Sequence, residues 1–148
     1  MAANVITDNV MRYFNDVVGN GDLELINELV HPQAKDLSGD WPAGREGFRQ
    51  HMSSFHSAFD ITSVTVDRII TDGKHAAVYW RVKGRHIGRA FGIEPGGKEI
   101  ENSAISTLRF LDGKISEYKV MFDMLNFLAQ AGDLGLWAKY FNNSPVKE

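Results

Sequence analysis

The sequence of 148 residues contains no cysteine and only four prolines. The absence of cysteine excludes disulfides, thiol catalysis and zinc–thiolate sites. No apolar run is long enough to cross a membrane, and the N-terminus has no basic segment followed by an apolar one. These absences predict a soluble protein, and they favour a cytoplasmic location without a membrane partner.

The chain also lacks a strong charge of either sign, because its formal net charge is -3 and its lysines and arginines form no run. Such a chain is not expected to bind nucleic acid. It has no phosphate loop, no dinucleotide fingerprint and no His-Glu-x-x-His helix. We therefore expect no cofactor and no metal, since no metal-like spacing with carboxylates is found for His31, His51, His56 and His75.

Apolar residues make up 43% of the chain, which is ordinary for a globular protein. The length is the usual size of one domain, so we expect a single domain over residues 1–148. Apolar residues recur at helical spacing over residues 7–18, 22–30 and 44–59, which predicts three helices. Residues 33–43 are expected to be irregular, because glycine and proline interrupt them.

The second half of the sequence changes to the alternating period of strands over residues 61–70, 75–86, 99–111 and 114–122. Asp72-Gly73 and Asp112-Gly113 predict hairpin turns. A short helix is expected over 124–131, and the tail at 133–148 could add one or two amphipathic turns. This order predicts an α+β fold: a cone-shaped curved antiparallel sheet with three N-terminal helices packed on its concave face, around a cavity.

Asp123 is the carboxylate that stands out, because it follows an apolar run where the last strand passes into a helix. At the wall of an apolar cavity it could act as a general acid or base, and the alternative is that it only caps the helix. Lys119 lies on the same strand face, so both side chains could point inward as a pair or outward into solvent. His86, at a strand end, is a candidate proton carrier or a structural histidine.

Aromatic residues are expected mostly in the core, although some could line a cavity for a flat or apolar ligand. The candidates for this substrate-binding role are Tyr13, Trp41, Phe55, Trp80 and Phe91.

Several segments in a fixed order carry a resemblance to a known family. They are GNGDL at 19–23, GREGFR at 44–49, GRHIG at 84–88 followed by FGIEPGGK at 91–98, and GKISE at 113–117 leading to Asp123 and Gly132. Over about residues 9–132, the chain resembles the SnoaL-like polyketide cyclases of the nuclear-transport-factor-like fold group. In characterised cyclases of this family, an aspartate of the closing strand is the acid–base of an intramolecular aldol closure, and by position it corresponds to Asp123.

The resemblance implies a cofactor-independent lyase or isomerase that acts on a small, mostly apolar carbonyl compound in an internal cavity. In that role His86 or Lys119 would orient the carbonyl oxygen. Two departures from the family pattern, Leu37 in place of a histidine and Lys119 in place of a tryptophan, favour the alternative of a non-catalytic binding protein.

Two further expectations come from the same fold group. Epoxide hydrolysis ranks lower, because Asp123 could recruit Arg81 or Arg109 but no second aspartate is clearly placed. A homodimer through the open face of the sheet is also expected, since Tyr79, Trp80 and Tyr118 are carried by the strand faces.

Overall fold

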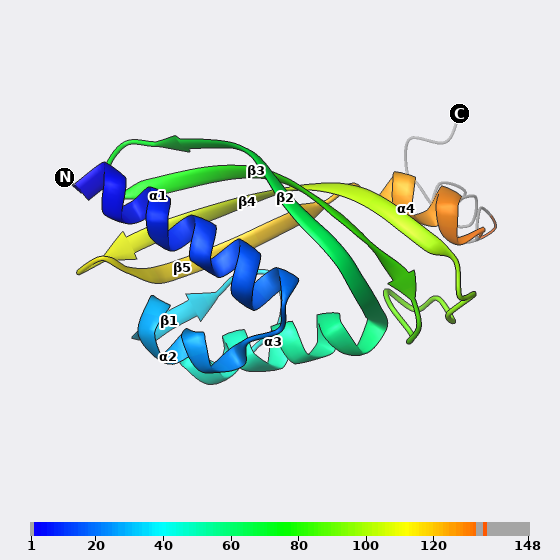
Figure 1. Ribbon diagram of the computed structural model, residues 1–148. Helices are drawn as coiled ribbons and strands as arrows, with labels where there is room; N and C mark the ends of the chain where they lie inside the picture. Colours follow the sequence, from blue (N-terminus) through cyan, green and yellow to red (C-terminus); the bar gives the residue numbers. More distant parts are fainter. Residues whose placement is uncertain (1, 133–134, 136–148) are drawn as a thin grey trace, which may run out of the picture.

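The computed structural model describes residues 2–132 and residue 135. In this part of the chain, helices lie against one face of a curved sheet (Figure 1). The sheet has five strands in the order β1-β5-β4-β3-β2. Their bounds are β1 Val30–Asp36, β2 Phe59–Thr71, β3 His75–His86, β4 Glu99–Leu111 and β5 Lys114–Phe122. The predicted α+β class and curved sheet are confirmed.

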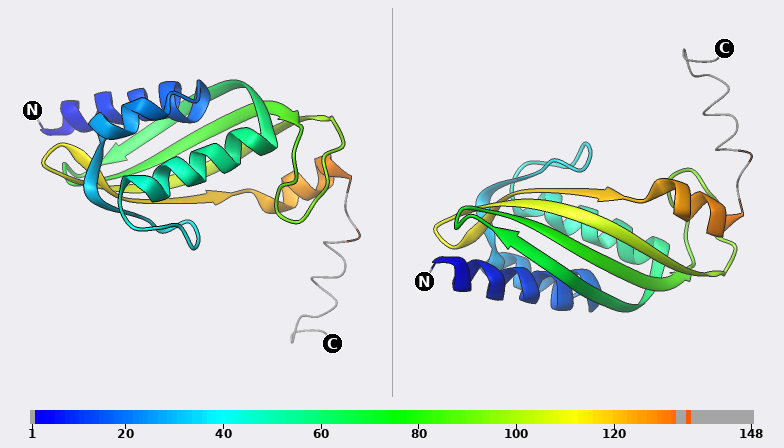
Figure 2. Two further views of the ribbon diagram at one scale, coloured as in Figure 1. Left: turned by 90° about the horizontal axis from the view of Figure 1, so that it is seen from below. Right: turned by 90° about the horizontal axis from the view of Figure 1, so that it is seen from above.

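The helices of the first half share one side of the sheet. They are α1 (Ala2–Arg12) with its π-helical continuation η1 (Tyr13–Gly19), the 3-10 helix η2 (Leu23–Leu25), α2 (Ile26–Leu29) and α3 (Arg45–Ala58). Both α1 and α3 lie against the concave face, and α4 (Met124–Ala131) lies at the end of the sheet (Figure 2). No helix among residues 2–132 is long and apolar enough to span a membrane.

Local pattern predicted several elements with the bounds that the structure has, namely β3, β4, β5 and α4. At the β4–β5 turn, Asp112 and Gly113 have φ angles of 54° and 76°, as a type I′ hairpin turn requires. Gly132 ends α4 in the left-handed conformation, where glycine has no Cβ to clash. The amphipathic turns expected in the tail lie outside the described residues.

The strand β1 lies partly in the stretch that was expected to be irregular. It is an edge strand that runs parallel to β5, with Asp36 opposite Tyr118. Pro32 is tolerated there, because an edge strand need not donate from every backbone N–H. The sheet is therefore mixed rather than wholly antiparallel. This edge strand carries Asp36 into the protein, where only 5% of the residue is exposed.

Side chains alternate between the two faces of the sheet. On β4, every second residue from Ile100 to Phe110 is buried, and those between are exposed. On β5, Tyr118 is buried and Lys119 is exposed. We call the face against α1 and α3 the inner face and the opposite one the outer face. Because buried and exposed residues alternate along a strand, the position of a residue in this alternation decides whether its side chain can reach a cavity on the inner face.

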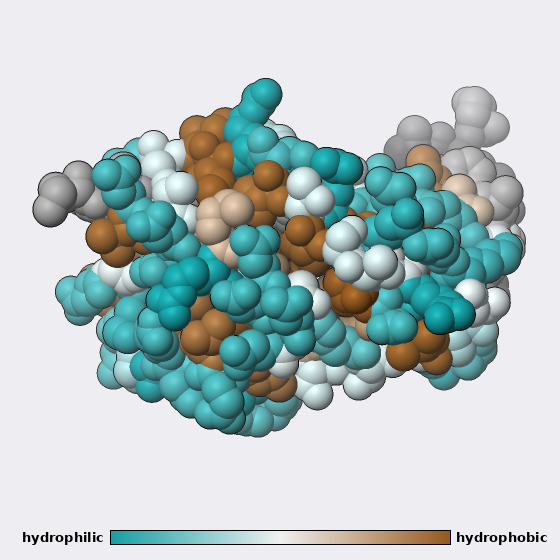
Figure 3. Space-filling model, in the orientation of Figure 1, coloured by the Kyte–Doolittle hydropathy of each residue, from teal (hydrophilic) through white to brown (hydrophobic). Residues whose placement is uncertain are grey.

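Two buried clusters fill the inner side. The larger one lies under α1, η1 and α3. There the ring centroid of Phe14 lies 5.2 Å from that of Trp80 and 6.5 Å from that of Tyr118. The smaller one contains Phe59, Ile100 and Phe127. On the face seen in Figure 3, the apolar residues form separate patches among hydrophilic ones. Side chains of the larger cluster therefore fill the space between these helices and the middle of the sheet.

Candidate functional site

A cleft of about 730 Å³ opens beside α3. Its walls come from the turn after β1, from α3, from the loop 87–98, and from the end of β5 with the start of α4. Apolar side chains make up most of these walls, and five of them are aromatic: Trp41, Phe55, Phe59, Phe91 and Phe122. The side chains that bring polar atoms are Ser38, Asp40, His51, Ser54 and Arg89. The arrangement suits an apolar ligand with a few polar groups.

His51 and Asp36 form a hydrogen-bonded pair at this cleft. The Nδ1 atom of His51, on α3, lies 2.6 Å from Oδ2 of Asp36, the last residue of β1. The side chain of Asp36 is 1% exposed and that of His51 is 14% exposed. The second oxygen, Oδ1, accepts the backbone N–H of Ser38 at 2.9 Å. Asp36 is therefore held on both oxygens, and Nδ1 of His51 is occupied.

The other ring nitrogen of His51 is the one left for a ligand. No hydrogen bond of Nε2 is found among residues 2–132, and the atom is not among the buried unsatisfied ones. The ring stacks on Trp41 with centroids 5.0 Å apart and an interplanar angle of 13°. When Nδ1–H donates to the Asp36 carboxylate, Nε2 of the neutral ring carries the lone pair and can act as a base. The pair has the geometry of a general base with an orienting carboxylate.

The structure does not bring the three predicted catalytic residues together. Asp123 is exposed, and its Oδ1 accepts the backbone N–H of Asn126 at 3.0 Å, which caps α4. Lys119 and Met121 are exposed on the outer face of β5, so Lys119 points outward, and Asp123 is exposed directly after the strand. Neither Lys119 nor Asp123 lines the cleft.

His86 is buried rather than cleft-lining, with 1% of the residue exposed. Its ring stacks on Phe59 at 5.3 Å and meets the edge of Phe127 at 5.5 Å. It cannot polarise a carbonyl held beside Asp123, because it lies on the inner side of the sheet.

Of the predicted substrate-binding residues, Trp41, Phe55 and Phe91 line the cleft. Tyr13 does not, because it is fully buried and its ring packs on Phe14 and Phe48. Trp80 is also core, with 2% exposed and its Nε1–H donated to Ser106 Oγ at 3.0 Å. Both are structural residues of the larger cluster.

Comparison with known proteins identifies the family of this chain. The family model described as SnoaL-like polyketide cyclase matches residues 8–131. The chain belongs to the SnoaL-like polyketide cyclase family. It shares 26% identity over 117 residues with the nogalonic acid methyl ester cyclase of Streptomyces nogalater, across 76% of this chain and 87% of that protein.

Solved structures show the same fold. IdmH from Streptomyces antibioticus is 28% identical, with a TM-score of 0.72 over 86% of this chain and 98% of that one. TsrD from Streptomyces laurentii superposes with a TM-score of 0.75 at 22% identity, over 89% of this chain and 96% of that one. The likeness to TsrD concerns the fold alone.

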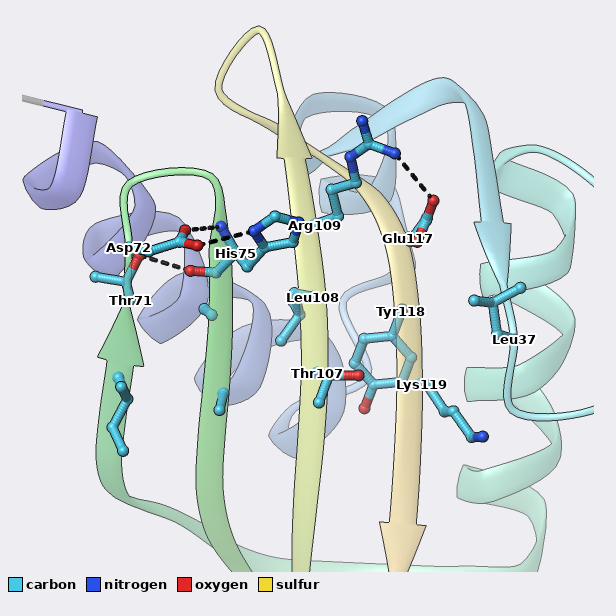
Figure 4. A pocket seen from close by; sticks show the side chains of 13 residues that line it. Leu37, Thr71, Asp72, His75, Thr107, Leu108, Arg109, Glu117, Tyr118 and Lys119 are labelled. Atoms are coloured by element: carbon cyan, nitrogen blue, oxygen red, sulfur yellow. Dashed lines mark hydrogen bonds and ion pairs between the residues drawn. The ribbon is translucent and has the colours of Figure 1, made fainter.

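The outer face of this SnoaL-like chain carries two troughs, of about 380 Å³ and 640 Å³. Lys119 lines the first, which is seen in Figure 4, and Asp123 lines the second. In the first trough, the Asp72 carboxylate accepts the backbone N–H groups of Lys74 and His75 and lies 3.1 Å from His75 Nδ1. These backbone bonds lower the pKa of Asp72. Arg109 pairs with Glu117 at 3.4 Å on the same face.

Arg81 is likewise on the outer face, where it pairs with Asp67 at 2.9 Å. Both arginines considered for an epoxide-opening site thus lie on the face opposite α3, paired with carboxylates of neighbouring strands. The sequence pattern missed the Asp36–His51 pair, because the two are 15 positions apart and Asp36 belongs to a strand that was not predicted. No local spacing signals it. Among residues 2–132, no group of three or more His, Asp or Glu side chains is placed to hold a metal.

Two buried tyrosines should make the folded chain less stable at alkaline pH. Burial raises the pKa of Tyr13 well above its ordinary value, and it also raises the pKa of Tyr118, against a smaller lowering by the Ser106 hydrogen bond. The unfolded chain ionises near pH 10, so the stability that depends on neutral phenols is present below about pH 10 and is lost as the pH rises further.

Tyr13→Phe is expected to leave stability at about pH 8 unchanged or up to about 1 kcal/mol higher, because the Tyr13 hydroxyl is buried with no partner among the described residues. Above about pH 10, the wild type should lose about 1.4 kcal/mol per pH unit more than the variant. Urea unfolding followed by circular dichroism at both pH values measures this. Parallel pH curves for the two proteins would contradict the assignment.

Proposed function

We propose that this chain is a cofactor-independent cyclase or isomerase that moves a proton next to the carbonyl group of a small, mostly apolar compound in the cleft. His51 is the acid–base group, and Asp36 is its positioning residue. The Asp36–His51 hydrogen bond of 2.6 Å at a mostly apolar cleft carries the proposal.

The chemistry follows from His51 Nε2, which makes no hydrogen bond within residues 2–132. His51 Nε2 takes a proton from the carbon beside the carbonyl, and the bonding electrons form an enolate. The buried carboxylate of Asp36 faces the imidazolium ion that results and stabilises it. In an isomerisation, the same proton returns to another carbon. In an aldol closure, the enolate carbon attacks a second carbonyl carbon and the proton passes to the new alkoxide oxygen.

The family membership supports a cyclase or isomerase on this frame. The relative from Streptomyces nogalater acts on nogalonic acid methyl ester, which makes that ester a first candidate substrate. The family resemblance assigns the acid–base role to Asp123, but the exposed capping position of that residue favours His51 for the role. The competing function is a non-catalytic binding protein that uses the same aromatic cleft.

A generic ketone separates the two functions without knowledge of the substrate. With 2-tetralone in D₂O, the proposed enzyme should replace the protons beside the carbonyl with deuterium faster than the protein-free solution, as followed by proton NMR. Stabilisation of the fold by 2-tetralone without any faster exchange would instead establish the binding protein.

We also propose that two copies of the chain associate through the outer face. Ile105 and Met121 are opposite each other on β4 and β5, and they are 39% and 65% exposed. Tyr79, on β3, adds a third exposed apolar side chain, whereas Trp80 and Tyr118 point inward and are buried. An apolar centre within a charged rim is typical of a protein interface.

Light scattering should give twice the mass of one chain for the wild type and the mass of one chain for Ile105→Lys. Leu125→Lys, at an exposed apolar position on α4, is the matched control and should remain a dimer. A monomeric wild type at micromolar concentration would rule this interface out.

A further inference from the structure

The proposed reaction develops a negative charge on the substrate, and Asp36 and His51, which we call the acid–base pair, cannot stabilise it alone. When His51 removes the proton, the carbonyl group becomes an enolate and the charge gathers on its oxygen. A hydrogen-bond donor fixed at that oxygen lowers the barrier, and loss of one such donor usually costs about 10²–10³ in rate. The cleft therefore needs a donor close to the carbon that is deprotonated.

Besides the acid–base pair, four residues bring polar side-chain atoms to the cleft: Ser38, Asp40, Ser54 and Arg89. Asp40, as a carboxylate, can only accept hydrogen bonds and would repel an enolate. Arg89 is a cation, but 68% of its side chain is exposed and it is already ion-paired. Ser54 is exposed on α3. Ser38 is half-buried, and its backbone N–H donates directly to the acid–base pair.

Ser38 is held beside the acid–base pair by hydrogen bonds at its backbone and at its side chain. Its backbone N–H donates to Asp36 Oδ1 at 2.9 Å, and His51 Nδ1 lies 2.6 Å from the other oxygen of the same carboxylate. Its Oγ accepts the backbone N–H of Val120, on β5, at 3.0 Å. One carboxylate thus positions both Ser38 and His51, and both residues line the cleft.

The hydrogen bond from Val120 leaves the Ser38 hydroxyl able to donate. A serine Oγ can accept two hydrogen bonds and donate one, and the Val120 N–H occupies an acceptor position. The hydroxyl proton remains for a group in the cleft. A hydrogen bond accepted at Oγ also polarises the O–H bond, which strengthens the hydrogen bond that the hydroxyl donates.

We propose that Ser38 is a further catalytic residue of the cleft, whose hydroxyl donates a hydrogen bond to the substrate carbonyl oxygen and stabilises the enolate. This assignment rests on the proposed proton transfer at His51. No bond to Ser38 forms or breaks in the reaction, and the hydroxyl proton stays on Oγ. The proton taken from carbon stays on His51 Nε2 until it returns to carbon or passes to the new alkoxide.

The carbonyl stretch of bound 2-tetralone tests this contact without turnover. In infrared difference spectra with the ketone labelled with ¹³C at the carbonyl, the wild-type complex should show the stretch at lower frequency than hexane does, because a donated hydrogen bond weakens the C=O bond. In Ser38→Ala, the stretch should return most of the way to the hexane value. The maximal rate of proton exchange should fall by about 10²-fold, while KM changes by less than about threefold.

Matched variants separate a donated hydrogen bond from a merely structural role. Ser38→Thr keeps the hydroxyl and should keep both the lowered stretch and the maximal exchange rate to within about threefold. Ser57→Ala removes an exposed hydroxyl of α3, which donates to the Ser53 carbonyl outside the cleft lining, and it should match the wild type. His51→Asn should lose exchange but keep the lowered stretch, so failure of the proposed function and failure of this assignment give different results.

The unmodified chain decides the matter if Ser38→Ala folds poorly because the Val120 N–H loses its acceptor. A wild-type complex whose carbonyl stretch stays at the hexane value would overturn the proposal, whether or not the protein catalyses exchange. A folded Ser38→Ala protein that keeps the lowered stretch or the wild-type rate would also overturn it. A wild type that did not bind 2-tetralone would contradict this assignment and the proposed function together.

Discussion

Replacement of His51 by asparagine is expected to lower the rate of proton exchange into 2-tetralone by a factor of about 10²–10⁴, the usual contribution of a general base. The asparagine amide can still donate to Asp36 near the position of Nδ1, so the buried carboxylate keeps a partner. Only the free Nε2 is lost. The folded protein should therefore remain stable to within about 1 kcal/mol.

Asp123→Asn is the matched control for this loss of rate. Its amide oxygen can still accept the N–H of Asn126, so α4 stays capped, while the acid group is gone. We expect exchange rates within about twofold of the wild type, because the Asp123 side chain does not line the cleft. If Asp123→Asn abolished proton exchange while His51→Asn kept it, the acid–base group would be Asp123 rather than His51.

Gly47→Ala is expected to destabilise the chain by about 2–3 kcal/mol, although helix propensity alone predicts a gain of up to about 1 kcal/mol. Gly47 is the third residue of α3, and a Cβ there would lie 2.0 Å from the backbone oxygen of Pro42. A backbone atom cannot rotate away as a side chain can. The turn that carries Trp41 must therefore move, and with it one wall of the cleft.

Urea unfolding measures the loss of stability, and the exchange assay should show reduced activity in the same protein. Gly96→Ala is the control, because the nearest atom to its added Cβ would be Lys98 Cγ at 4.0 Å. We expect a change within about 0.5 kcal/mol there. If Gly47→Ala were as stable as the wild type, the close approach of α3 to the turn after β1 would be wrong.

The sequence by itself determined most of the frame. The strands β3, β4 and β5 and the helix α4 have the predicted bounds, because alternation, Asp-Gly turns and a final glycine are local signals. The strand β1 was not predicted, because no local signal marks it. Its partner β5 lies about 80 residues later and runs parallel to it, so no turn or period marks the pair.

The sequence also marked Trp41, Phe55 and Phe91 as candidates for a ligand site, and the structure places all three at the cleft. It could not separate them from Tyr13 and Trp80, because aromatic residues of the core and of a cavity wall have the same spacing along an element. The sequence could not decide the role of Asp123 either. A carboxylate at the end of a strand has the same sequence context whether it faces a cavity or caps a helix.

Only the tertiary structure decided which acid–base groups meet. Asp36 becomes buried because β1 docks on β5, and His51 reaches it because α3 crosses the same edge. Neither event leaves a trace in local sequence, since a hydrogen bond between a strand and a helix depends on how the two pack. The periodicity of the chain determined the strands and helices around the cleft, and their packing determined which polar side chains meet there.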